Sequence, residues 1–123
     1  MAAGDFEKLA SHLLHSRTQS HVYHLQTESY AEHMALNAYY TGVVALIDGL
    51  VESYQGKNGI IKKYTSFTLN NYEGNKETIA YFKALQKNIE SLSSDVKETY
   101  LLNQIDTITE LVQSTIYKLS YLS

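Results

Sequence analysis

The chain has 123 residues, of which 44% are hydrophobic, and its formal net charge is −3. This length and hydrophobic content suit one domain with a buried core, so we expect a single domain over residues 1–123 and exclude a disordered chain. The absence of cysteine excludes disulfides and thiolate metal ligands, and no secretory leader or membrane-spanning segment is predicted.

Apolar residues recur at intervals of three and four along most of the chain, which is typical of helices packed on one side. Proline, which breaks helices, is absent. Ser29 is followed three residues later by Glu32, a pattern that predicts a capping box at a helix start. The spacing predicts four helices, over residues 5–27, 30–55, 76–92 and 95–121.

The connection over residues 57–75 is rich in Asn, Gly and Ser and is unusually long for a compact domain. A connection of this length usually carries a short element, and we expect one or two helical turns in "IIKKY", residues 60–64. No strand-like alternation is present. The sequence therefore predicts an all-α fold, a four-helix bundle with a short extra helix between helices two and three.

Polar residues that can bind metal ions follow one side of the second predicted helix. Steps of four residues drift by about 40° around a helix, so His33, Asn37, Asp48 and Glu52 lie on one broad face. At about 1.5 Å per residue, however, His33 and Asp48 are roughly 22 Å apart along the axis. Metal–ligand bonds are only about 2.0–2.2 Å long, so one ion cannot contact both residues of one chain.

A second copy of the chain resolves this conflict. If two copies of the helix cross antiparallel about a two-fold axis near residues 41–43, His33 of one copy faces Asp48 and Glu52 of the other. Gly42 would permit close approach there. Histidine and carboxylate ligands suit iron, and also zinc or manganese. The alternative is a solvated acidic patch and a hydrogen-bonded His33.

The first predicted helix carries the other histidines. His21 and His24 fall on its buried side, where an imidazole without a partner is costly, and a metal ion or a carboxylate would serve as that partner. His12 and His15 are predicted to be surface residues. The pattern alone therefore leaves both His21 and His24 as candidate ligands.

Four segments resemble the Dps-type miniferritins of the ferritin-like superfamily. "HVYHL" is similar to the segment that carries the first-helix histidine of that family, and "SYAEHMAL" to the segment that carries the second-helix histidine. "ALIDGLVESYQG" is similar to its Asp-x-x-x-Glu segment, and "TYLLNQIDTITELVQSTIYKLSYL" to its last helix. The run from "HLQTESYAEH" to "ESYQG" is closer still to small Dps-like proteins of bacteriophages.

The resemblance implies a function and a site. It implies a ferritin-like bundle that oxidises Fe(II) at a ferroxidase site between two subunits, with iron storage in a dodecameric cage. It implies a location in the cytoplasm of a bacterial host, or in a virion. The family pattern has an acid where this chain has Asn37. The lysine-rich tail that many members use to bind DNA is absent, so DNA binding is not expected. The ligands it implies are His24 or His21, His33, Asp48 and Glu52, with Asn37 beside them.

Two other functions fit the same residues. A phage protein that keeps the helical scaffold without catalysis, as a virion component or in contact with the host, would explain Asn37 and the tyrosine-rich surface. A structural zinc ion at the same site would hold the homodimer without redox chemistry. Loss of assembly on chelation, without iron oxidation, would distinguish the zinc site.

Overall fold

The computed structural model describes residues 4–123, and its regular elements are all helical. No strand is present in this described part of the chain, which confirms the predicted all-α class and the four-helix bundle. The predicted helix ends are correct to within four residues. The helices are α1 (Asp5–Gln26), α2 (Tyr30–Asn58), α3 (Asn75–Leu92) and α4 (Thr99–Tyr121).

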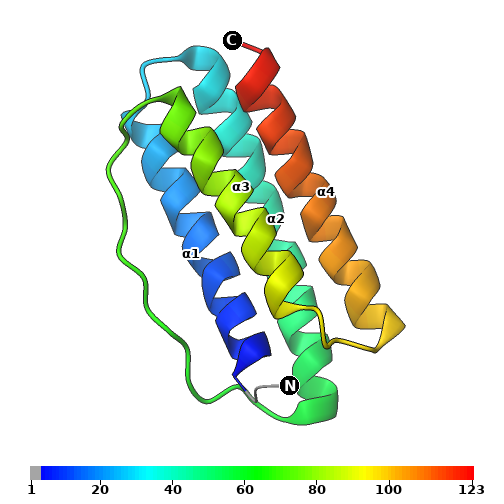
Figure 1. Cartoon of the computed structure of the whole chain (residues 1–123). Coiled ribbons are helices and arrows are strands. Elements are labelled where there is room, and N and C mark those ends of the chain that lie inside the picture. The colour runs from blue at the N-terminus through cyan, green and yellow to red at the C-terminus, as the bar shows by residue number, and fades with distance from the viewer. Residues whose placement is uncertain (1–3) are drawn as a thin grey trace.

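The four helices form a bundle in which each one packs against two neighbours. α1 contacts α2 and α3, and α4 contacts the same two helices, so α1 and α4 occupy opposite corners. The tight turn at residues 27–29 makes α1 and α2 antiparallel (Figure 1). The long connection over residues 59–74 then carries the chain back to the other end, so α3 runs parallel to α2.

The interior is built from aliphatic side chains around a few aromatic rings. Tyr39 is fully buried, and its ring meets that of Phe82 edge-on at a centroid distance of 4.9 Å. The Tyr39 hydroxyl shares a hydrogen bond of 2.7 Å with Ser16 Oγ, and burial raises the pKa of Tyr39. The other large residues with almost no exposure are Phe6, Leu9, Leu13, Leu36, Ile47, Leu50, Ile89, Leu101 and Ile108.

The start of α2 is capped largely as the sequence predicts. Ser29 is the N-cap residue, and its side chain accepts a hydrogen bond of 3.2 Å from the Glu32 N–H. The second hydrogen bond of the capping box, from the N-cap N–H to the Glu32 side chain, is replaced by an indirect one. The Thr27 hydroxyl donates to the Glu32 carboxylate, and Thr27 Oγ1 accepts from the Ser29 N–H. Thr27 therefore relays the bond that the carboxylate makes directly in a standard capping box.

We expect the Ser29→Ala variant to lose about 1 kcal/mol of unfolding free energy, because the first turn of α2 then loses its side-chain acceptor. Chemical denaturation of the variant beside the unchanged protein measures this loss. Ser120→Ala, at an exposed position near the end of α4, is the matched control and should change little. Equal stabilities of the two variants would contradict the capping role.

The connection over residues 59–74, here called the strap, runs extended beside α1 (Figure 1). The extra helix predicted at residues 60–64 is wrong, because the strap contains no helical turn. Its main chain bonds to side chains instead of to itself. The Ile61 N–H donates to Gln55 Oε1 at 3.0 Å, and the Thr65 N–H donates to Ser11 Oγ at 2.9 Å. These side chains satisfy the groups that a helix would pair internally.

Side chains on one stripe of α1 hold the strap along most of its length. Gln19 makes the closest match, because its amide donates to the Asn70 carbonyl at 2.8 Å and accepts from the Asn70 N–H at 2.7 Å. Residues four apart share a helix face, which aligns these contacts in a row. The contacts are Ser11 with Thr65, His15 with Thr68, Gln19 with Asn70 and Gln26 with Tyr72.

Helix α2 is long and apolar enough, by length and composition, to cross a membrane, so the prediction that no segment reaches this length is wrong. Core helices of water-soluble bundles pass the same criterion, and α2 packs against both α1 and α4. Only 33% of its most apolar window is buried within one chain. Much of its outer side is therefore apolar and uncovered.

Candidate metal centre

His24 and His33 lie face to face where α1 meets α2. Their rings stack with a centroid distance of 3.7 Å and an interplanar angle of 20°. His24 Nδ1 is 2.8 Å from the His33 carbonyl oxygen, and His33 Nδ1 is 2.9 Å from the His24 carbonyl oxygen. His24 is buried and His33 is half-buried. The pair therefore joins the two helices reciprocally, with each ring bonded to the main chain of the other.

These two hydrogen bonds place a proton on Nδ1 of both rings. A carbonyl oxygen only accepts, so each Nδ1 must carry a proton and donate it. In the neutral imidazoles the lone pair then lies on Nε2, for which no hydrogen-bond partner is present among the described residues. Histidines that bind metal ions usually donate their other ring N–H to a carbonyl or carboxylate in this way. Both rings are thus in the tautomer that can bind a metal ion through Nε2.

His21 takes a different role from His24. Its ring stacks on Tyr40 with a centroid distance of 4.1 Å, and its centroid is 5.9 Å from that of His24. Of the two first-helix candidates, the structure brings His24 against His33. His24 has the partner that a buried imidazole needs, because its Nδ1 atom donates to the His33 carbonyl, and a metal ligand role through Nε2 stays a prediction.

A small surface hollow gives solvent access to His33. Its volume is about 290 Å³, and it opens at the turn between α1 and α2. The exposed Glu28 also lines it, so one carboxylate lies in the same hollow as His33. The remaining lining residues are Thr27, Ser29 and Tyr30.

The other candidate ligands on α2 lie apart from the histidine pair. Asn37 is half-buried, and the exposed Asp48 and Glu52 stand one turn apart on the outer side of the helix. Neither carboxylate has a hydrogen-bond or ion-pair partner in residues 4–123, where the one ion pair joins Lys57 to Glu98 at 2.5 Å. Their charges are therefore free to attract a cation or a partner.

One chain does not assemble a complete metal site. Among residues 4–123, no three His, Cys, Asp or Glu side chains are placed to hold one metal ion. His24 and His33 supply two nitrogen ligands, and stable binding in known sites usually needs three or four protein ligands. A metal ion bound by this pair would therefore need further ligands from outside these two side chains.

The sequence matches a protein family described as "Family of unknown function (DUF5856)" over residues 24–119. The chain belongs to this family. The DUF5856 match begins at His24 and contains His33, Asp48 and Glu52, whereas His21 lies just outside it. No curated protein matches the chain, and no solved structure does.

Sequence reasoning missed one feature of this DUF5856 chain, a buried carboxylate directly behind His33. Glu32 accepts hydrogen bonds from Thr27 Oγ1 at 2.6 Å, from the Tyr72 hydroxyl at 2.5 Å and from Asn75 Nδ2 at 2.8 Å. Burial, followed by the bond to Glu32, raises the pKa of Tyr72. The capping motif marked Glu32, but nothing in the sequence links it to Tyr72 or Asn75. Glu32 thus joins the α1–α2 turn to the strap and the start of α3.

Proposed function

We propose that the protein is a Dps-like iron-binding protein that oxidises Fe(II) between two antiparallel copies of α2. One observation carries the proposal. The His24–His33 pair, with both Nε2 atoms unbonded, lies near one end of α2, and the unpaired carboxylates of Asp48 and Glu52 lie near the other. An antiparallel partner helix brings these two half-sites together twice.

Exposed positions on the outer side of α2 are equally spaced on either side of Thr41. Met34 lies as far before Thr41 as Asp48 lies after it, and Tyr30 and Glu52 are related in the same way. All five side chains are exposed. A two-fold axis at Thr41 would therefore place the histidine end of one helix against the acidic end of the other, which a self-complementary interface requires.

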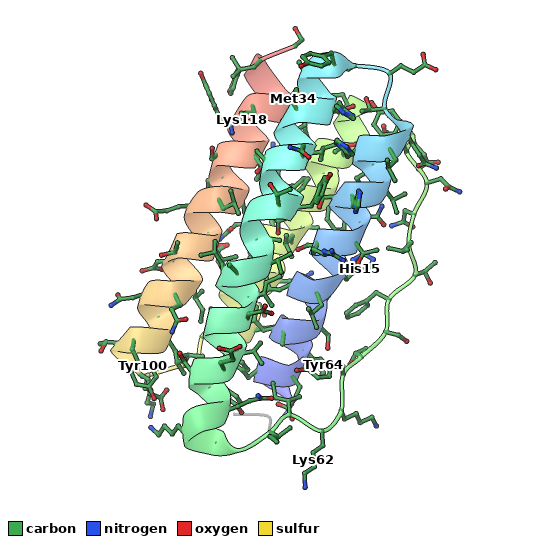
Figure 2. All side chains as sticks on the ribbon, turned by 180° about the vertical axis from the view of Figure 1, so that it is seen from behind. His15, Met34, Lys62, Tyr64, Tyr100 and Lys118 are labelled. Carbon is green, nitrogen blue, oxygen red and sulfur yellow. The ribbon has the colours of Figure 1, made fainter. Side chains whose placement is uncertain are left out.

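The middle of this outer side is small and apolar. Figure 2 shows α2 facing the viewer between α4 and α1, with Met34 near its upper end. Thr41 and Ala45 are exposed there, and Val44 is 36% exposed. A Cβ atom added to Gly42 would lie 3.6 Å from Leu111 Cδ2, so Gly42 faces α4. Thr41 and Ala45 are therefore better placed than Gly42 to permit the close approach.

The path of the chain supports the same proposal. Antiparallel helix pairs joined by one long crossover connection are typical of ferritin-like bundles. Here the strap is that crossover, between α2 and α3. Such bundles bind metal ions through side chains of facing helices, and here the facing helices would be two copies of α2.

The ligands also suit the reaction. Two imidazole nitrogens and two carboxylates bind Fe(II), and the negative charge of the carboxylates favours the more highly charged Fe(III) product. Two Fe(II) ions each give up one electron, and hydrogen peroxide takes both electrons with two protons to form water. Asn37 contributes no charge, so the site relies on Asp48, Glu52 and Glu28.

A complementation experiment tests the shared site. We expect the His33→Ala and Asp48→Ala proteins each to oxidise Fe(II) no faster than buffer, with air or peroxide as the oxidant. When the two variants are mixed and allowed to exchange chains, each mixed dimer has one site with both residues intact. Random pairing makes half of the dimers mixed, so about a quarter of the unchanged activity should return.

Asp106→Ala, which removes an exposed acid from α4, is the matched control and should keep full activity. Sedimentation of each variant shows whether the dimer persists. Activity that fails to return on mixing, in variants that still dimerise, would contradict a site shared between chains.

The non-catalytic oligomer is favoured by one observation. The reciprocal His24–His33 hydrogen bonds already join α1 to α2 without an ion. Under this alternative, the unchanged protein dimerises through α2 but oxidises Fe(II) at the buffer rate. Dimerisation that depends on zinc and is lost on chelation would instead indicate a structural metal ion.

A further inference from the structure

A histidine outside the proposed iron site, His15, is bonded to a tyrosine. His15 lies on α1 beneath the strap, on the side of the bundle where the strap passes (Figure 2). Its Nδ1 atom is 2.9 Å from the Tyr81 hydroxyl, and its Nε2 atom is 2.9 Å from the Thr68 carbonyl oxygen. His15 therefore connects α1, α3 and the strap, although it was predicted to be a surface residue.

The bond between His15 and the strap decides which atom is the donor in the hydrogen bond between His15 and Tyr81. The Thr68 carbonyl only accepts, so Nε2 of His15 carries the proton and donates it. In the neutral ring Nδ1 is then an acceptor, and the Tyr81 hydroxyl donates to it. The Tyr81 phenol thus has a nitrogen base at hydrogen-bond distance.

The surroundings of Tyr81 make that base important. Its ring meets those of Tyr23 and Phe82 edge-on, at centroid distances of 5.9 and 5.5 Å. Burial raises the pKa of Tyr81, so the phenolate does not form at neutral pH. A phenol that loses an electron becomes strongly acidic. In a buried site its proton must pass to a nearby acceptor, because a charged radical cation is poorly solvated there.

We propose that Tyr81 and His15 form a redox-active pair in which Tyr81 gives one electron to a one-electron oxidant. The O–H bond of Tyr81 breaks as the electron leaves, and the proton forms a new N–H bond at His15 Nδ1. The products are a neutral Tyr81 radical, a His15 imidazolium and the reduced oxidant. The imidazolium keeps its Nε2–H bond to Thr68 and donates its new proton to the radical oxygen. The return of one electron reverses the step.

No other tyrosine in residues 4–123 donates its hydroxyl to an imidazole. The Tyr39 hydroxyl meets that of Ser16, which is a poor base. The Tyr72 hydroxyl donates to Glu32, but that carboxylate already accepts from Thr27 and Asn75 and is a weaker proton acceptor for it. Tyr81 is therefore the tyrosine with the best-placed base.

Small solutes can approach the pair. A surface cavity of about 300 Å³ is lined by Tyr81 and His15 together with His12, Phe67 and Asn88. The ring of His12 stacks on Phe67 at a centroid distance of 4.3 Å, and burial, followed by the nearby His15, lowers the pKa of His12. The cavity is wide enough for a small solute to reach both side chains. This inference does not depend on the proposed iron site.

Flash photolysis with a photogenerated ruthenium(III) polypyridyl oxidant tests the pair. We expect the unchanged protein to give a long-lived tyrosyl radical by electron paramagnetic resonance, formed more slowly in D₂O because a proton moves with the electron. Tyr81→Phe should reduce the long-lived radical at least tenfold. Tyr117→Phe, at an exposed tyrosine of α4, is the control and should leave the signal unchanged.

His15→Gln separates a structural role from a redox role. Glutamine can still bond to Thr68 and Tyr81 but cannot take up a proton at neutral pH. We expect this variant to melt close to the unchanged protein and to lose the long-lived radical. A radical of equal yield and lifetime in His15→Gln or in Tyr81→Phe, or a rate that is the same in D₂O, would overturn the proposal.

Discussion

Gln19→Leu is expected to free the middle of the strap from α1 and to cost about 2 kcal/mol of unfolding free energy. Gln19 has no exposed surface, and its amide pairs with both the N–H and the carbonyl of Asn70. Leucine fills a similar volume but makes neither bond. The Asn70 main chain must then move out to water, and the strap moves with it.

Two measurements check this prediction. Chemical denaturation gives the loss of stability, and limited proteolysis shows where the native chain has opened, since open segments are cut first. We expect new cleavage within residues 59–74 before the helices are lost. Gln113→Leu, at an exposed site on α4, is the control. Unchanged cleavage of the strap in Gln19→Leu would show that other contacts hold it.

Glu32→Ala is expected to have the larger effect, a loss of about 3 kcal/mol or more. The carboxylate is 4% exposed and accepts from Thr27, Tyr72 and Asn75, which belong to the turn, the strap and α3. Alanine opens a cavity and leaves the half-buried Thr27 and Tyr72 hydroxyls without this acceptor, whereas Asn75 Nδ2 keeps its bond to the Leu119 carbonyl. Each unpaired buried donor costs about 1–3 kcal/mol, although water can enter the new space and offset part of that cost.

Thermal and chemical unfolding of Glu32→Ala measure the loss, and Glu110→Ala, an exposed acid on α4, is the matched control. We expect the Glu32 variant to unfold well below the control. Hydrogen exchange should also rise at the Tyr72 N–H, because the end of the strap loses its contact with α2. Equal stability of the two variants would mean that Glu32 is dispensable for the junction.

The helices were predictable because each follows a local rule. Apolar spacing predicted their number, and the Ser29 cap marked the start of α2. The conformation of the strap does not follow from a local rule. Residues 60–64 carry nothing that forbids a helical turn, but Gln55 and Ser11 bond the main chain there in an extended form. These contacts depend on how the helices are arranged in space, which no local pattern contains.

The candidate site was predictable in part. Spacing along α2 singled out His33, Asp48 and Glu52. The sequence left His21 and His24 as alternatives on the first helix, and the structure places His24 beside His33. Spacing could not indicate that each histidine bonds to the main chain of the other, because carbonyl groups are common to all residues. The Tyr81–His15 contact was equally hidden, since the two residues belong to different helices far apart in the sequence.

Apart from the Asn71 and Tyr72 side chains, the strap is held largely through its main chain, and this has a consequence for how its sequence can change. Ser11, Gln19 and Gln26 recognise N–H and carbonyl groups, which nearly every residue type supplies at those positions. Most strap side chains, including Lys62 and Lys63, point into solvent. Mutations should therefore accumulate faster in the strap than in the α1 stripe that holds it. The same property makes the strap a natural place to graft a foreign epitope or affinity tag without disturbing the bundle.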